Sequence, residues 1–287
     1  SLRARLFVTT ALVLSVSLPG HAEDLTRLDE LALLRESLRA TLHAAGFPNR
    51  IWNASDLVNW TSALLDPHRR QGEGTRLHYD DGREIRAQVI DPATQLSVDR
   101  DGIRVRNDQR HEELSIRLLS VRSYPPRHAL WQMGSLIGDL YQNTLQIPCP
   151  FLISLNVHVL DAERTRSWAQ LKAARATTKA GSTMARFLPD LQDKRADWGI
   201  VLKALDEGQH LVDLQHQIAL FTSPEDATRC EQAARAVFRA RGFELTRDTL
   251  MASQALIASL PLTLSKPFHA DLARMKRVTT KTSANAV

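Results

Sequence analysis

The sequence is poor in the cysteines that hold small secreted folds together and in the long apolar runs that cross membranes. Its 287 residues include only two cysteines, Cys149 and Cys230, which lie far apart in the chain. This usage predicts no disulfide framework and is typical of a reducing compartment, although a single pairing stays open. The apolar run at residues 6–18 is shorter than the roughly 18 residues that a membrane-spanning helix requires. The sequence therefore argues against a disulfide-rich scaffold and against a membrane-spanning protein.

Motifs that bind nucleotides or carry common catalytic groups are also absent from the sequence. None of the 12 glycines begins the pattern GxxxxGK[ST], in which backbone N–H groups and a lysine hold phosphates. No GxGxxG fingerprint stands between a predicted strand and a helix. His111 and Glu112 begin like a zinc-protease helix, but Ser115 replaces the second histidine that a metal would need. We therefore expect no catalytic residue, no cofactor and no metal in this chain.

The N-terminal residues 1–22 support two interpretations. Two arginines precede the apolar run at 6–18 and a Pro-Gly turn follows it, an order typical of a secretory signal peptide. Within the run, however, apolar and polar residues alternate from Leu14 to Leu18, which is typical of a half-buried strand. We favour the strand, and an exported protein that loses residues 1–22 is the alternative.

What the sequence does contain is a mixed composition with a weak basic bias. Hydrophobic residues make up 43% of the chain, which is enough for a globular core at this length. The 37 basic and 32 acidic residues give a formal net charge of +5 and are mixed along most of the chain. Binding of single-stranded DNA by the basic stretch from Lys266 to Lys281 and by exposed tryptophans is a second alternative. Packing in a core or interface is the favoured role of the tryptophans, which are Trp52, Trp60, Trp131, Trp168 and Trp198.

Hydrophobic periodicity predicts both helices and strands. Apolar residues recur at spacings of three and four in helices, and at every second residue in half-buried strands. We expect helices at 23–45, 53–65, 128–146, 161–179, 188–207, 224–241 and 248–260. We expect strands at 84–90, 114–121, 151–160 and 210–221, and a hairpin at 95–106 that turns at Asp99-Arg100-Asp101-Gly102. The residues after Leu260 are expected to be irregular.

These elements predict an α+β fold. The strands of the first half fit a mixed, mostly antiparallel sheet, or sheets, packed by several amphipathic helices. Because the length is above the usual size of a single core, one large domain and two subdomains both stay open. Two subdomains would comprise residues 1–126 and residues 127–287, with the boundary at the two prolines that end a predicted strand.

The segment MGSLIGDLYQNTLQIPCPF contains the candidate interface residues. Gly134 and Gly138 lie four positions apart in a predicted helix, with Asp139 following them, so that another backbone could approach this face closely. Pro148 and Pro150 fix the approach of the chain to the next strand. We single out these five residues as candidates for helix packing or an interface, while packing within the chain's own fold is the simpler role.

The same segment resembles the N-terminal region of the TraC-type ATPases, the motor and assembly components of conjugative type IV secretion systems. Other segments are similar to that region in the same order. Residues 33–67 are similar to the family's helix, Gly-Phe break and second helix ahead of a loop. Residues 188–221 are similar to its middle segment, and residues 257–287 are similar to the stretch just upstream of its nucleotide-binding domain. The resemblance covers most of the chain from Asp24 onward.

The resemblance implies a function in conjugation. In this family ATP and Mg²⁺ bind in a domain that lies C-terminal to the region described here, so a chain that stops at Val287 would be a non-catalytic assembly and docking region. The full-length parent would be an ATPase that supports pilus assembly and DNA transfer. The resemblance further implies a cytoplasmic protein, peripheral at the inner membrane, whose partners are other components of the secretion channel. Homo-oligomerisation of the full-length protein and contact with DNA stay open.

Overall fold

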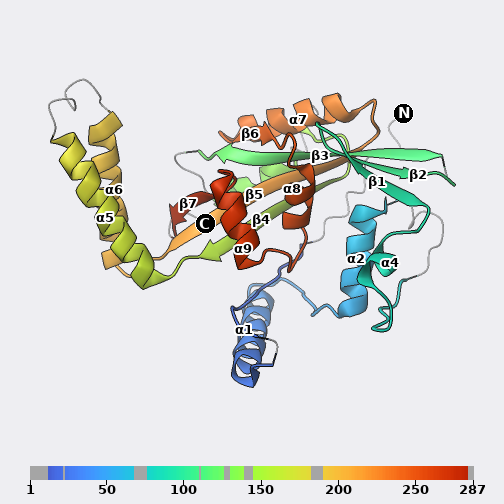
Figure 1. Ribbon diagram of the computed structural model, residues 1–287, viewed down its shortest axis with the longest axis horizontal. Coiled ribbons are helices and arrows are strands. Elements are labelled where there is room, and N and C mark those ends of the chain that lie inside the picture. The colour runs from blue at the N-terminus through green and yellow to red at the C-terminus, as the bar shows by residue number, and fades with distance from the viewer. Residues whose placement is uncertain are drawn as a thin grey trace. The chain divides into compact units, whose positions relative to one another are not determined.

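The chain divides into two compact units that interleave along the sequence. The computed structural model (Figure 1) describes residues 12–21, 23–67, 76–109, 111–125, 130–138, 145–181 and 190–283. One unit comprises residues 1–95, 105–112 and 260–265, and the other comprises residues 96–104, 113–259 and 266–287. Two consecutive subdomains divided after residue 126 stay a prediction.

Helix α1 (Leu25–Ala44) opens the first unit. Asp24 caps this helix by accepting a hydrogen bond from the backbone N–H of Arg27. None of the residues of α1 is buried, and Leu25 and Leu33 are more than 70% exposed. Local hydrogen bonds and capping therefore define α1, while its leucines have no core of this chain around them in the described residues.

Helix α2 (Ala54–Leu65) begins with a complete capping box. The Asn53 side chain accepts a hydrogen bond from the backbone N–H of Asp56, and the Asp56 carboxylate accepts one from the backbone N–H of Asn53. Arg50 donates two further hydrogen bonds to the same carboxylate, at 2.7 and 2.9 Å. Arg50, together with the Asn53 N–H, holds the pKa of Asp56 well below its ordinary range. These contacts fix the start of α2, beside which the short helix α4 (Ile85–Val89) packs.

Seven strands of the described residues form one curled antiparallel sheet. They are β1 (Thr94–Val98), β2 (Ile103–Asn107), β3 (Glu112–Ser123), β4 (Phe151–Val159), β5 (Leu211–Thr222), β6 (Glu244–Arg247) and β7 (Thr279–Thr282). The order is β1-β2-β3-β5-β4, with β6 paired to β3 and β7 paired to β5. Strand β5 pairs with β4 along one side and with β3 and β7 along the other, so it is the most central strand.

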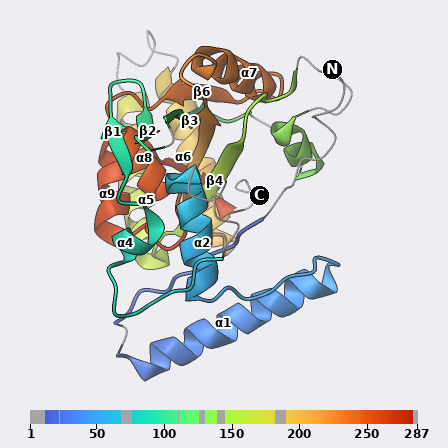
Figure 2. The same ribbon diagram turned by 90° about the vertical axis from the view of Figure 1, so that its right-hand side faces the viewer.

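One face of β5 contributes to an apolar core. Ile218 and Leu220 of this strand pack in one cluster with Val237 and Phe238 of helix α7 (Ala227–Arg239). Helix α7 lies beside β5 and β6 (Figure 2). Every residue of β5 is buried, so its other face must also be covered.

The opposite face of β5 contacts helices α8 (Ala252–Ala258) and α9 (Lys266–Arg274). In Figure 1 these helices lie in front of β4 and β5. The side chain of Asn156 in β4 donates a hydrogen bond to the carbonyl of Ala258, and His269 of α9 lies against the side chains of β4 and β5. The sheet is therefore covered on both faces at β5.

Helices α5 (Ala162–Ala180) and α6 (Asp190–Asp206) connect β4 to β5. They lie side by side as a helical hairpin (Figure 1). The rings of Trp168 and Trp198 meet edge to face at 5.2 Å, and Arg166 forms an ion pair with Asp206. None of the helices in the described part of the chain combines the length and the hydropathy that crossing a membrane requires.

Most of the elements predicted from periodicity are present. Among the helices, those at 23–45, 53–65, 161–179, 188–207, 224–241 and 248–260 correspond to α1, α2, α5, α6, α7 and the shorter α8. Among the strands, those at 114–121, 151–160 and 210–221 correspond to β3, β4 and β5, and the hairpin at 95–106 corresponds to β1 and β2. The prediction of an α+β fold is confirmed.

Two predicted strands are wrong. Residues 84–90 contain helix α4 instead of a strand. The side-chain amide of Gln88 forms hydrogen bonds with the backbone of Asp80 and Arg83, and these bonds hold the buried Gln88 side chain against the preceding loop. Residues 12–18 have no regular secondary structure, and Leu12 and Leu14 are 86% and 61% exposed. The alternation there meets no partner strand in the described residues, and residues 6–11 lie outside them.

Two further predictions are corrected in the second half of the chain. In place of a helix through 128–146, the described residues form a 3₁₀ helix, η1 (Leu130–Ile137), and Gly138 follows it with a φ of 120°. This φ is incompatible with a continuing right-handed helix. In place of an irregular C-terminus, α9 and β7 follow residue 260, because pairing with β5 orders a short strand that local sequence does not predict.

Candidate functional site

Strand β5 has three buried polar side chains at alternate positions, Asp213, Gln215 and Gln217. Alternate residues of a strand share a face, here the face that meets α8 and α9. Each of the three is at most 9% exposed. Because a buried polar group costs free energy unless it is hydrogen-bonded, their partners decide what this face can do. We call these three residues the polar row and consider it the candidate functional site.

At one end of the polar row, Gln217 is joined to the end of α8. Ser259 Oγ lies 3.0 Å from Gln217 Oε1 and 3.2 Å from Ser154 Oγ of β4. The same Oγ lies 2.9 Å from the carbonyl oxygen of Ala255. A hydroxyl has one proton, so Ser259 donates either to Gln217 or to Ala255 at a given moment. This hydroxyl connects β4 and β5 to the end of α8.

In the middle of the polar row, Gln215 lies opposite Asn156 of β4. Asn156 Nδ2 donates to Gln215 Oε1 at 3.1 Å and to the carbonyl oxygen of Ala258 at 2.7 Å. Gln215 Nε2 is buried and has no hydrogen-bond partner within the described residues. A buried donor without a partner costs about 1–3 kcal/mol, so the middle of the row is poorly satisfied.

At the other end, Asp213 lies between His158 of β4 and Thr280 of β7, its neighbours in register. Thr280 Oγ1 donates a hydrogen bond to Asp213 Oδ1 at 2.6 Å. His269 of α9 packs its ring against that of His158, with centroids 4.4 Å apart, and its Nε2 lies 3.4 Å from Asp213 Oδ2. Three strands and one helix thus contribute to this cluster.

The surroundings of His269 favour its neutral form. Burial lowers the pKa of His269 below its ordinary value, and the neighbouring His158 lowers it further, while the Asp213 carboxylate acts in the opposite direction. The residue is 9% exposed. The side chain of His269 is therefore a neutral imidazole near neutral pH.

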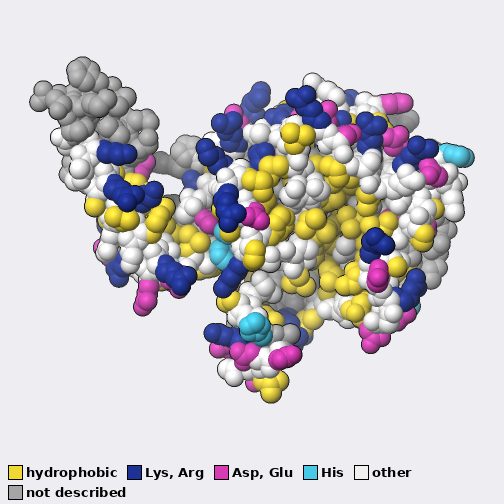
Figure 3. Space-filling view, viewed as in Figure 1, with side chains coloured by type: hydrophobic (Ala, Val, Ile, Leu, Met, Phe, Trp, Pro, Cys, Tyr) yellow, Lys and Arg dark blue, Asp and Glu magenta, His cyan; other side chains and the backbone are white. Residues whose placement is uncertain are grey.

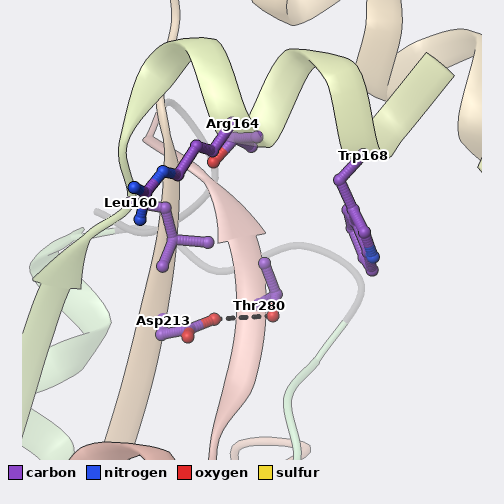
Figure 4. Close-up of a pocket in the computed structure, with 6 residues that line it drawn as sticks. Leu160, Arg164, Trp168, Asp213 and Thr280 are labelled. Atoms are coloured by element: carbon purple, nitrogen blue, oxygen red, sulfur yellow. Dashed lines mark hydrogen bonds between the residues drawn. The ribbon is translucent and has the colours of Figure 1, made fainter. Parts of the chain in front are cut away.

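An open cavity of about 290 Å³ adjoins the Asp213 end of the polar row (Figure 4). Asp213 and Thr280 line it from the strands, and the hydrogen bond between them is drawn in Figure 4. Arg164 and Trp168 extend from α5 toward opposite sides of the cavity. The remaining lining residues are Leu160 and Thr165. The cavity thus combines a carboxylate and hydroxyls with a guanidinium and an indole ring.

A second buried polar cluster joins β3 to the C-terminal part of the chain. Asp248, which is 2% exposed, accepts a hydrogen bond from Ser120 Oγ at 2.7 Å and pairs with Arg277 Nε at 3.2 Å. Burial raises the pKa of Asp248, while the Ser120 hydrogen bond and the Arg277 charge oppose that rise. These contacts serve the fold, because none of the three residues lines the cavity.

The polar row offers hydrogen-bonding groups to a ligand. Histidine and aspartate are common metal ligands, and His158, Asp213 and His269 lie together. In the part of the chain that the structure describes, however, no three His, Cys, Asp or Glu side chains are arranged to hold a metal ion. The cavity beside the row presents acceptor oxygens to a ligand, together with the guanidinium of Arg164 and the indole ring of Trp168.

Of the five interface candidates chosen from the sequence, the four that lie in the described residues do not line the cavity. Gly134 is exposed, and a Cβ at this position would meet no atom within 4 Å. Gly138 adopts a φ of 120°, which L side chains rarely adopt. Pro148 is half-buried, and the carbonyl of Pro150 accepts a hydrogen bond from β5 at the start of the β4–β5 ladder. Asp139 lies outside the described residues. The interface role of these residues stays a prediction.

The two cysteines meet in the apolar core, although they are distant in the sequence. Cys230 of α7 is buried in the cluster on β5, and Cys149, just before β4, packs against that cluster. Both are free thiols. Burial, followed by the contact with Cys230, raises the pKa of Cys149 well above its ordinary value. Cys149 is therefore a protonated packing residue in this state.

Sequence reasoning predicted strand β5 but missed the polar row. The signal was present, since Asp213, Gln215 and Gln217 occupy every second position of the segment LVDLQHQIALF, with Leu214 and His216 between them. Such alternation is typical of a strand with one face in solvent. Only the packing of α8 and α9 shows that this face is covered as well, and α9 lies in a stretch that was expected to be irregular.

Comparison with known proteins gives two consistent matches. A family model described as TraC protein matches residues 7–264. The protein TraC of Escherichia coli (strain K12) is 24% identical over 266 residues, which cover 88% of this chain. The match spans 30% of the length of that protein. The family match includes β4, the α5–α6 hairpin and β5, and it ends before α9 and β7.

Proposed function

Because the chain belongs to the family of TraC-type conjugative transfer proteins, we propose that it is a docking and assembly region of such a protein. Membership of the family supports a role in conjugative transfer. The proposal assigns no catalytic site to residues 1–287 and assigns ATP and Mg²⁺ binding to another part of the protein. The lack of a GxxxxGK[ST] pattern in the sequence is consistent with that assignment.

Strand β4 is the observation that supports docking best. No strand in the described ranges pairs with its outer edge. Leu155, Val157 and Val159 alternate along one face of this strand and are 43%, 54% and 59% exposed. An exposed apolar edge strand offers unpaired backbone groups and side-chain contacts to another extended segment. The occupant in this proposal is an extended segment of another component of the conjugative secretion channel.

Helix α1 supports the same interpretation. The helix contains seven leucines, yet none of its residues is buried. Four of the leucines are half-buried and recur at helical spacing, namely Leu31, Leu34, Leu38 and Leu42. A helix of this kind gains stability when its apolar side packs against a partner. With both surfaces engaged, the protein would work at the cytoplasmic face of the inner membrane, as a peripheral member of the channel assembly.

A substitution on the edge strand tests the proposal. Val157→Lys places a charge in the middle of β4, which opposes the addition of a further strand. In matings with a donor whose gene for this protein carries the substitution, we expect the transfer frequency to fall at least tenfold. The reason is that the partner segment can no longer pair along β4.

The matched control is Ile257→Lys on α8. Ile257 is 48% exposed, so this variant also replaces an exposed apolar residue by lysine. We expect it to transfer normally, and immunoblots should show equal amounts of both variants. Normal transfer by Val157→Lys at equal protein level would refute docking at β4.

A further inference from the structure

Helix α5 presents a row of cations interrupted by an aromatic ring. Arg164, Trp168, Lys172 and Arg175 are spaced by four, four and three residues, so they lie along one side of the helix. We call these residues the α5 stripe. With a rise of 1.5 Å per residue, the stripe is about 16 Å long. On the face seen in Figure 3, the hairpin of α5 and α6 shows Lys and Arg side chains beside hydrophobic ones.

The stripe is not neutralised by acids of the same helix. Within α5 the one acidic residue is Glu163, which the helical spacing places on the side away from the stripe. Asp206 of α6 pairs with Arg166, which lies outside the stripe. The stripe is therefore a local concentration of positive charge, although basic and acidic residues are nearly balanced over the whole chain.

Trp168 is held in place at the base of the stripe. Its side chain is 46% exposed, the ring of Trp198 meets it edge to face at 5.2 Å, and Lys172 Nζ lies 5.5 Å from its ring centroid. A partly exposed indole fixed by neighbours is a platform on which a planar ring can stack. Directly beside it lies the cavity of Figure 4, with Asp213 and Thr280 across from the helix.

We propose that the α5 stripe and the cavity at its base bind single-stranded nucleic acid. Phosphates would pair with the cations along the helix, a base would stack on Trp168, and its amino or imino N–H groups would donate to Asp213 or Thr280. This inference concerns a surface other than the β4 edge, and it does not rest on the docking function proposed above.

The other partners of a basic helix fit these residues less well. An anionic membrane would require an apolar face free to enter the lipid, but the small side chains Ala169 and Ala180 on the apolar side of α5 are buried. An acidic polypeptide would pair with the cations, but only an aromatic side chain at one particular spacing from its acidic residues would also stack on Trp168. A single strand of nucleic acid supplies phosphates, planar rings and hydrogen-bond donors together.

The experiment measures binding of a fluorescein-labelled single-stranded DNA of mixed sequence, about 20 nucleotides long, by fluorescence anisotropy. Lys172→Glu with Arg175→Glu should lower the affinity at least tenfold. It should also reduce the slope of log affinity against log salt by about one to two, since each phosphate contact contributes roughly 0.7 for single strands. Trp168→Ala should lower the affinity at least fivefold, and Trp168→Phe should restore most of it.

The matched control is Arg229→Glu with Arg239→Glu on α7, which changes the net charge equally at another exposed helix. It should bind nearly as tightly as the unmodified chain. Equal loss in the control and the stripe variant would refute the proposal, because the binding would then reflect net charge alone. Absence of DNA binding at low salt would also refute it, as would preferential binding of anionic phospholipid vesicles or polyglutamate through the same cations.

Discussion

The two faces of strand β5 are equally buried but differ in chemistry. On the α7 side, Ile218 and Leu220 meet apolar and aromatic side chains. On the α8 and α9 side, the polar row meets hydroxyl, amide and imidazole groups. Apolar contacts are non-directional and add with area, whereas each buried polar group needs a particular partner at a particular angle. One face therefore supplies stability, and the other defines where α8, α9 and β7 must lie.

Breaking the apolar face should have the largest effect. Phe238 is fully buried and its ring meets Phe243 at 5.9 Å and His216 at 6.1 Å. Phe238→Ala should lower the free energy of unfolding by about 3–5 kcal/mol, because it removes a large apolar side chain and leaves a cavity. Urea unfolding followed by circular dichroism measures this value. A loss below about 1 kcal/mol would mean that α7 does not form the main core.

Breaking one contact of the polar row should have a smaller effect. In Gln217→Leu, Ser259 loses one acceptor but keeps the carbonyl of Ala255 as the other. We expect a change of about 1 kcal/mol or less in the free energy of unfolding, measured in the same way. A loss as large as that of Phe238→Ala would show that the polar row contributes to stability as strongly as the apolar face.

The smallest expected effect is a pH dependence at His269. Its pKa is lowered in the folded protein, so the unfolded chain takes up the proton first as the pH falls below about 6.5. Stability is therefore fully present above that pH and decreases as the pH falls toward the lower pKa of the folded state. Melting curves between pH 7.5 and 5 should show a shallower decrease for His269→Gln. An identical decrease in both proteins would refute this origin.

The comparison also explains how far the sequence could predict the structure. Helices α1 and α2 and strands β3, β4 and β5 have clear caps or periodicities, and these predictions are confirmed. Strand β7 has only the polar residues Thr279 to Thr282, and it forms because Leu211 to Leu214 of β5 pair with it. The hydrophobic pattern of a short segment does not predict its pairing with a strand that is distant in the sequence.

The candidate site was less predictable than the fold for the same reason. Asp213 meets His269 and Thr280 only through elements that lie more than 50 residues away in the sequence. Gly134 and Gly138 were chosen because a continuous helix was expected there, and η1 with the positive φ of Gly138 replaces that helix in the described residues. The α5 stripe, by contrast, depends on helical spacing alone.

The helical hairpin has a mechanical consequence. Helices α5 and α6 are joined to the adjacent ends of β4 and β5, which pair over their full common length from Phe151–Leu220 to Val159–Val212. A pull on the hairpin along the strand direction loads both strands equally and produces no shear between them. The load passes instead to the shorter ladders that hold β5 to β3 and to β7. A force applied to the hairpin would therefore move β4 and β5 together, as one unit, relative to the other strands of the sheet.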